Sequence, residues 1–156
     1  MFKEFSDVFA WSYKDLKSYE TEIIQHKIPL KENQKLFKQK LRRINPVQLH
    51  LVEKEIKKMY EDGIIVPIRY SECVSNLVSF RKKTREIGLC IDFRDLNKAS
   101  LKDNYPLPKM DHILQRGVGS KRIYLLDGYS GYNKILVHPD DQLKTTFTSP
   151  WALSCI

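Results

Sequence analysis

The sequence KRIYLLDGYSGY, residues 121–132, decides how this chain is interpreted. Its apolar residues at 123–126 predict a short buried strand, and Asp127 follows directly at the end of that strand. The next residues, Gly-Tyr-Ser-Gly, predict a tight turn whose backbone can approach a large ligand, since glycine has no Cβ. A carboxylate beside such a turn suits a metal ion or a phosphate group. An Asp-Gly pair after an apolar run is also a common simple turn, so this segment alone leaves both interpretations open.

The length and composition favour one domain with its own core in 156 residues. The apolar runs are far shorter than the roughly 20 residues of a membrane-spanning helix, and the first residues lack the features of a secretory signal. Cys73, Cys90 and Cys155 are widely spaced, which indicates ordinary thiols in a reducing compartment and not disulfides or a zinc site. We therefore expect an intracellular protein, cytoplasmic or nuclear, that is neither secreted nor in contact with a membrane.

The charge distribution predicts an anionic partner. The formal net charge is +8, and nucleic acid is the commonest partner of a basic protein of this kind. Positive residues cluster in 31–58 and again in the segment 81–85, RKKTR. A solvated basic surface is the simpler explanation. Two separate clusters nevertheless favour a surface that follows a phosphate backbone.

The first half of the chain predicts a leader, an arm and a helix. Residues 1–27 carry aromatic residues without a sustained period, which predicts an irregular leader with one short helix, and 28–43 predict an extended basic arm on the body of the domain. Asn45 is a favourable N-cap, Pro46 suits the first helical turn and Gly63 suits a helix end, so a helix is expected over 46–62. Its apolar positions fall on one face.

The second half predicts strands and a basic hairpin. A short strand is expected over 64–67, where Pro67 would end it or place it at a sheet edge. Residues 74–80 and 87–93 predict two paired strands whose basic tip, 81–86, could fold over a triphosphate. An extended link with two prolines at 103–108 precedes a short helix near 109–115.

Three motifs resemble the reverse transcriptases, those of the gypsy-type LTR retrotransposons in particular. LDGYSGYNKI at 126–135, followed by PDD and KTTF, resembles the segment with the first catalytic aspartate. CIDFRDLNK at 90–98 resembles the fingers, and YPLP at 105–108 resembles the passage from fingers to palm. The resemblance implies a mixed α/β (α+β) fold: the fingers and the first part of the palm of a right-hand polymerase, with a mixed or antiparallel sheet and flanking helices. Residues 28–156 would form this part, and 1–27 would be a connector that follows a protease region.

The resemblance also implies roles for individual residues. Asp127 would be the catalytic carboxylate and would bind Mg²⁺, with the Gly128 carbonyl as a further ligand. Arg94 and Asn97 would contact the template. The residues implied in nucleotide binding are Lys82, Lys83, Arg85, Ser130, Gly131 and Tyr132. Two alternatives stay open: Tyr132 as a packed core residue instead of a gate beneath the sugar, and Arg94 in a local ion pair with Asp92 or Asp95.

Two departures from the family pattern affect the expected activity. Gly88 stands where the family usually carries an arginine that faces the triphosphate, and Thr84-Arg85 replaces the usual Asp-Gly turn. Either Arg85 substitutes for the missing arginine, or nucleotide affinity is impaired.

The family's other two catalytic aspartates, in a Tyr-x-Asp-Asp hairpin, have no counterpart in this chain. The family activity is RNA-directed DNA polymerisation on an RNA or DNA template-primer from deoxynucleoside triphosphates, with Mg²⁺ expected only in the complete polymerase. We expect this chain to be inactive alone. The alternatives are a non-catalytic, basic nucleic-acid-binding module and a decayed open reading frame.

Overall fold

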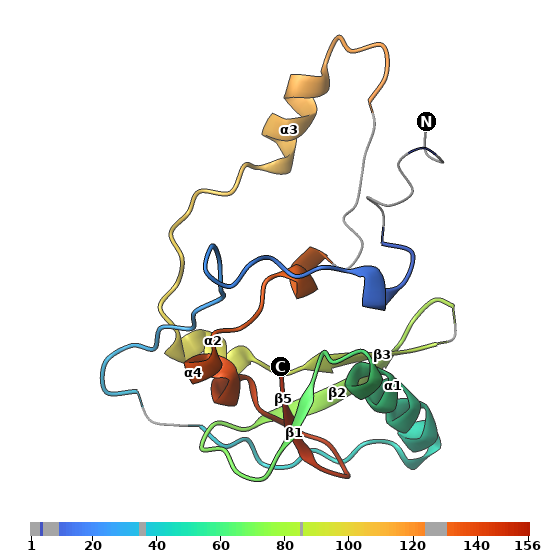
Figure 1. Ribbon diagram of the computed structural model, residues 1–156, viewed down its shortest axis with the longest axis vertical. Helices are drawn as coiled ribbons and strands as arrows, with labels where there is room; N and C mark the ends of the chain where they lie inside the picture. The colour runs from blue at the N-terminus through green and yellow to red at the C-terminus, as the bar shows by residue number, and fades with distance from the viewer. Residues whose placement is uncertain (1–3, 5–9, 35–36, 85, 124–130) are drawn as a thin grey trace.

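The computed structural model describes residues 4, 10–34, 37–84, 86–123 and 131–156. Its centre is a sheet of five strands in the order β1-β5-β4-β2-β3 (Figure 1). The strands are β1 (Val66–Ile68), β2 (Ser75–Arg81), β3 (Ile87–Ile91), β4 (Phe147–Thr148) and β5 (Leu153–Cys155). β2 and β4 are parallel and the other neighbours are antiparallel, so the expected α/β fold with a mixed sheet is confirmed.

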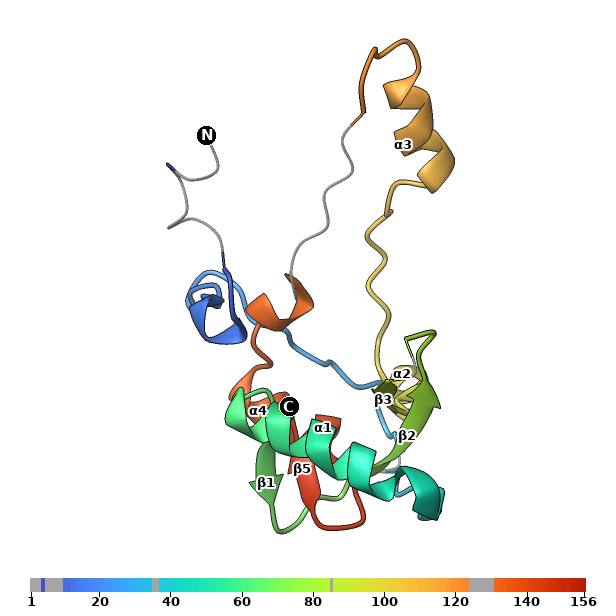
Figure 2. The same cartoon turned by 90° about the vertical axis from the view of Figure 1, so that its right-hand side faces the viewer.

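The helix α1 (Leu49–Glu61) covers one side of this sheet, as Figure 2 shows. The 3-10 turn η3 (Pro46–Gln48) precedes it, and the Asn45 side chain accepts a hydrogen bond of 3.0 Å from Val47 N. Together η3 and α1 match the helix predicted over 46–62. Buried apolar side chains from α1, from the sheet and from the link between α1 and β1 form the core: Val52, Ile56, Ile65, Leu77, Ile87 and Phe147.

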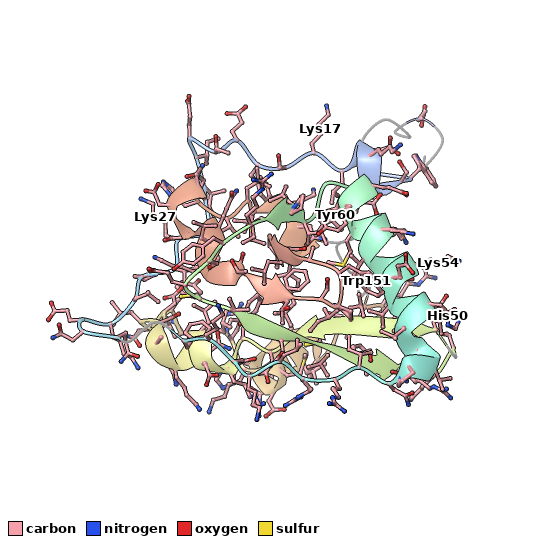
Figure 3. The ribbon with its side chains drawn as sticks, turned by 90° about the horizontal axis from the view of Figure 1, so that it is seen from below. Lys17, Lys27, His50, Lys54, Tyr60 and Trp151 are labelled. Carbon is pink, nitrogen blue, oxygen red and sulfur yellow. The ribbon has the colours of Figure 1, made fainter. Side chains whose placement is uncertain are left out.

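The polar side of α1 faces away from the sheet. Figure 3 shows His50 and Lys54 pointing outward from the helix, whereas Tyr60 points toward the strands. The Tyr60 hydroxyl forms a hydrogen bond with the Ser154 hydroxyl of β5. Gly63, at φ +69°, then turns the chain out of the helix, and Ile64 N donates to the Met59 carbonyl at 2.9 Å.

The strands occur close to their predicted places. The strand expected over 64–67 forms two residues later as β1, because Ile65 is buried in the core just before it. Pro67 lies opposite Ser154 in this edge strand, where one side needs no backbone donor. β2 and β3 form the predicted hairpin, with Arg81 opposite Ile87 as the last pair before the tip.

The basic arm lies beside β2, as expected. Val74 N donates to the Phe37 carbonyl, and Gln39 N donates to the Val74 carbonyl, both at 2.9 Å. The leader, with the 3-10 turn η2 (Tyr13–Asp15), runs along residues 134–138. His26 N donates to the Leu136 carbonyl at 2.8 Å, so the leader is hydrogen-bonded to a segment more than a hundred residues later.

The remaining helices are short. α2 (Arg94–Ala99) follows the hairpin, and η4 (Gly131–Lys134), α4 (Pro139–Gln142) and η5 (Leu143–Thr145) precede β4. α3 (Met110–Gly117), the helix predicted near 109–115, projects from the body and has no buried residue (Figure 1). The strand predicted over 123–126 lies outside the described residues except for Ile123, which is exposed and belongs to no strand.

Two other features bear on the sequence predictions. Cys73, Cys90 and Cys155 are free thiols, as expected. In the part of the chain that the structure describes, no helix has both the length and the apolar character to cross a membrane.

Candidate functional site

The tip of the β2–β3 hairpin presents positive charge to solvent. Lys82, Lys83 and Thr84 are all exposed there. Lys82 N donates to the Glu86 carbonyl at 2.8 Å and so closes the loop, and the Lys82 ammonium lies 3.6 Å from the Glu86 carboxylate. Such an exposed ion pair contributes little to stability and is readily exchanged for another anion. The tip therefore keeps cations available to a polyanion.

An ion pair fixes Arg94 at the base of the hairpin. Its guanidinium donates to both carboxylate oxygens of Asp92, at 2.7 and 2.6 Å. The Asp92 side chain is 8% exposed, whereas that of Arg94 is 74% exposed. The hydrogen bonds from Arg94 lower the pKa of Asp92 to about 2, against desolvation, with a smaller contribution from the charge of Arg42. The local ion pair that the sequence left open is thus formed, and it orients a guanidinium that stays accessible.

Arg94 and Asn97 lie on one exposed side of α2, because residues three apart in a helix are neighbours on its surface. The segment just before α2 is joined to the hairpin: Asp92 N donates to the Asn76 carbonyl of β2 at 2.9 Å. The structure therefore brings together two residues that the sequence assigned to template contact, next to the hairpin that carries Lys82 and Lys83.

A network of side-chain amides positions the basic arm beside this surface. The Gln39 amide donates to the Asp92 carbonyl at 3.0 Å and to the Asp95 carboxylate at 2.9 Å, and its oxygen accepts from Asn76 N at 2.8 Å. Asn76 in turn accepts from Arg42 N at 3.1 Å. These hydrogen bonds were not predicted from the sequence. Their partners lie 34 to 56 positions away in the chain, so no local pattern marks them.

The residues of the predicted catalytic segment are only partly described. Asp127, Gly128 and Ser130, as well as Arg85 of the hairpin tip, lie outside the described residues. Gly131 and Tyr132 lie in η4, apart from the hairpin tip in both ribbon views (Figures 1 and 2). Tyr132 is 97% exposed, so the alternative of a packed core aromatic was wrong.

The described residues do not provide a metal site of their own. They contain no group of three or more His, Cys, Asp or Glu side chains that could hold a metal ion. In the acidic pair at 140–141, Asp141 is already bonded to Ile28 N at 2.7 Å and to the Lys144 ammonium. Among the residues that the structure describes, the acidic side chains therefore do not fit two Mg²⁺ ions.

The structure gives a reason for glycine at position 88. Gly88 lies opposite Phe80 in the β2–β3 register. A Cβ added to Gly88 would lie 2.4 to 2.8 Å from three carbons of the Phe80 ring. The ring thus fills the space above the glycine, and no larger side chain fits there unless the ring moves. The family pattern marks Gly88 but not Phe80, although the short loop between them predicts their pairing.

No family model matches the chain. It is 36% identical over 102 residues to the retrovirus-related Pol polyprotein from transposon gypsy of Drosophila melanogaster, which covers 62% of this chain and 10% of that protein. It is 26% identical over 152 residues to the Pol polyprotein from transposon 412 of the same fly, covering 94% of this chain and 12% of that protein. The chain thus spans about a tenth of the length of these relatives.

The fold is similar to that of foamy virus protease-reverse transcriptases. A mutant of the prototype foamy virus protein matches 99% of this chain and 20% of its own, with a TM-score of 0.82 and 19% identity. A foamy viral protease-reverse transcriptase in complex with double-stranded DNA matches 99% of this chain and 32% of its own, with a TM-score of 0.74 and 14% identity. The chain is therefore similar in sequence to segments of retrovirus-related Pol polyproteins and similar in fold to part of the foamy virus protease-reverse transcriptases.

Proposed function

We propose that this chain forms the fingers and the first part of the palm of an RNA-directed DNA polymerase, and that its hairpin and α2 bind a nucleic-acid template-primer. Residues 28–156 would be the polymerase part and 1–27 the connector to a preceding protease region. The similarity of the fold to a reverse transcriptase solved with double-stranded DNA supports this proposal. The observation that carries it is the exposed cationic surface formed by the β2–β3 hairpin and α2.

Template contact is assigned to Arg94 and Asn97. The bond to Asp92 uses one edge of the Arg94 guanidinium and fixes its plane, so that its other N–H groups can donate to a phosphate or a base edge. Asn97, one turn later, adds an amide that both donates and accepts. Ordering the guanidinium before binding reduces the entropy lost when a ligand binds.

Nucleotide contact is assigned to the hairpin tip and to the turn after Asp127. In this proposal Lys82, Lys83 and Arg85 approach the phosphates of a deoxynucleoside triphosphate, since several cations can converge on one polyanion. Ser130 and Gly131 would offer backbone N–H groups to the same phosphates, and Tyr132 would lie beneath the sugar. The full exposure of Tyr132 leaves its ring free to do so.

Catalysis is assigned to Asp127, with the Gly128 carbonyl as a second oxygen ligand. When bound, Mg²⁺ supplies charge neutralisation at the transferring phosphate in such polymerases. A single carboxylate cannot hold two such ions, and the described residues add no cluster of metal ligands. We therefore propose that this chain binds template-primer but does not extend a primer alone.

Two assays test the proposal. In the first, fluorescence anisotropy follows binding of a labelled template-primer as salt is raised. Affinity should fall steeply with salt, and Arg94→Ala should weaken it, whereas Lys54→Ala, on the outer side of α1 (Figure 3), should change it little. Equal effects of the two substitutions would contradict the assigned surface.

In the second assay, primer extension is measured with Mg²⁺ and all four deoxynucleoside triphosphates. No incorporation is expected. Incorporation that Asp127→Ala abolishes would overturn the proposed inactivity. Binding itself should not change in Asp127→Ala, because that residue is assigned to chemistry and not to template contact.

A further inference from the structure

The Phe80 side chain lies flat against the backbone of the opposite strand. Phe80 and Gly88 are direct partners in the β2–β3 hairpin. A Cβ at Gly88 would lie 2.4 Å from Cζ and within 2.8 Å of both Cε atoms of the ring. The φ angle of Gly88 is not in the left-handed region, so the backbone would accept another residue. Glycine is needed here for the close approach of the ring and not for the conformation of the chain.

The ring stands on the side of the hairpin that faces away from the core. Leu77 and Ile87 are buried beneath α1. Because side chains alternate along a strand, Phe80 and Gly88 belong to the opposite face. Phe80 is 49% exposed there, although a phenylalanine in a strand is usually covered. A large apolar ring is thus held in one place on the backbone and is half open to solvent.

Positive charge lies beside this ring on the same hairpin. Arg81, Lys82 and Lys83 follow it directly and are exposed, and the oriented Arg94 guanidinium lies past the other end of β3. An exposed aromatic ring next to cations is the arrangement by which proteins bind unpaired nucleic acid: the ring stacks on a base and the cations contact the backbone. The ring is already ordered by Gly88, so little entropy is lost when a base stacks on it.

We propose that Phe80 is a stacking platform for an unpaired base of a single-stranded nucleic acid, and that Gly88 is the residue that positions its ring. This inference deepens the proposed function and rests on the binding of nucleic acid by the hairpin. It also gives a role to Gly88, which stands where the family usually carries an arginine. The family's arginine would contact a phosphate from this position. In this chain the Phe80 ring, packed against Gly88, contacts a base instead. The hairpin thus gains a contact that does not depend on salt.

The test is a comparison of oligonucleotides on the intact chain. Anisotropy is measured with a single strand of about 12 nucleotides, with the same strand carrying abasic sites, and with a blunt duplex. The normal strand should bind about tenfold more tightly than the abasic strand. The slope of affinity against salt should be the same for both strands, because their phosphates are equal in number.

Variants then locate the contact. Phe80→Leu should lose about tenfold in affinity for the normal strand and almost nothing for the abasic one, without a change in salt slope. Phe80→Tyr should keep most of the affinity. Gly88→Ala, which displaces the ring without removing it, should behave like Phe80→Leu. Tyr70→Leu removes an exposed aromatic residue outside the hairpin and is the matched control.

The outcomes separate this inference from the proposed function. If the normal and abasic strands bind equally, or if Phe80→Leu binds like the wild type while binding stays salt-dependent, the platform is refuted and the cationic surface stands. If the wild type binds no nucleic acid, both proposals are wrong. Circular dichroism melts of each variant show whether it is folded. Equal binding of the normal and abasic strands by the wild type would refute the platform even if Phe80→Leu does not fold.

Discussion

The carboxylate of Asp141 accepts a hydrogen bond of 2.7 Å from the backbone N–H of Ile28, which lies 113 residues earlier in the chain. The Lys144 ammonium donates to the same carboxylate and, at 3.0 Å, to the Ile28 carbonyl. These three groups join the start of the basic arm to α4 and η5. They therefore join the basic arm to the segment that follows the predicted catalytic turn.

Replacing Asp141 should destabilise the fold. In Asp141→Asn the single side-chain oxygen can accept from either Ile28 N or the Lys144 ammonium, but not from both. The amide NH₂ then faces the other donor, with which it cannot form a hydrogen bond. We expect a loss of about 1–3 kcal/mol in the free energy of unfolding, measured by urea denaturation. Asp140→Asn is the matched control, since the Asp140 side chain is 88% exposed and should tolerate the change. Equal losses in the two variants would show that the bonds of Asp141 contribute nothing specific.

The same carboxylate predicts a dependence of stability on pH. Burial of Asp141 acts to raise its pKa, but the hydrogen bonds from Lys144 and Ile28, with the Lys144 charge, outweigh burial and leave the pKa lowered. A pKa lowered on folding gives stability that is complete above the carboxyl pKa of the unfolded chain, about 4, and is lost as pH falls through the folded value. Urea midpoints should thus decline below pH 4 more steeply in the wild type than in Asp141→Asn. Parallel curves would argue against this coupling.

The ion pair of Asp92 predicts a second titration. The hydrogen bonds from Arg94 are the largest cause of its pKa of about 2, and desolvation acts in the opposite direction by raising the pKa. The carboxyl signal of Asp92 in a ¹³C NMR titration should therefore change near pH 2 in the wild type. In Arg94→Ala it should move toward pH 4, since the main cause of the shift is gone. Little change in that midpoint would mean that the pair is not maintained in solution.

Glycine 63 should be required for the turn after α1. Its φ of +69° is unfavourable for a residue with a Cβ, although the space around it is open. Gly63→Ala should therefore cost about 1–2 kcal/mol through backbone strain alone. Gly131→Ala is the control, because it has equal space and no left-handed φ. Thermal melting would show the difference, and a neutral Gly63→Ala would mean that the turn has another conformation in solution.

Local sequence signals predicted the elements of this fold and failed where the cause was not local. Asn45, Pro46 and Gly63 marked the limits of the helical segment, and the apolar period identified its buried face. The strand β1 was placed two residues early, because the apolar run at 64–66 does not show which of its members enter the core and which enter the sheet.

The candidate site was likewise predicted where local signals mark it and not where its contacts are distant in the sequence. The hairpin tip and the exposed Arg94 followed from the charge pattern and the motif. The Gln39 and Asn76 network could not be predicted, since amide side chains have no sequence period and their partners are distant. The full exposure of Tyr132 depends on the tertiary surroundings of η4, about which its local sequence carries no signal.

The Gln39 network gives a prediction that links stability to binding. The Gln39 side chain joins the basic arm to Asn76, to the Asp92 carbonyl and to Asp95. Gln39→Ala should leave these groups without their hydrogen-bond partner and lower the free energy of unfolding by about 1–3 kcal/mol. It should also weaken binding of a template-primer, because Asn76, which accepts from Arg42 N beside the hairpin, would lose its Gln39 partner.

Gln34→Ala is the control for Gln39→Ala, because it also replaces a glutamine of the arm by alanine but removes no hydrogen bond of the network. Gln34 is exposed on the same arm, and its backbone N–H donates to the Lys31 carbonyl at 3.4 Å, a bond that alanine keeps. The variant should therefore match the wild type in both assays. If Gln39→Ala is destabilised but binds normally, the arm does not contribute to the nucleic-acid surface. If it binds weakly and the reduction disappears at high salt, the arm acts through its charges, because only the electrostatic part of binding is screened.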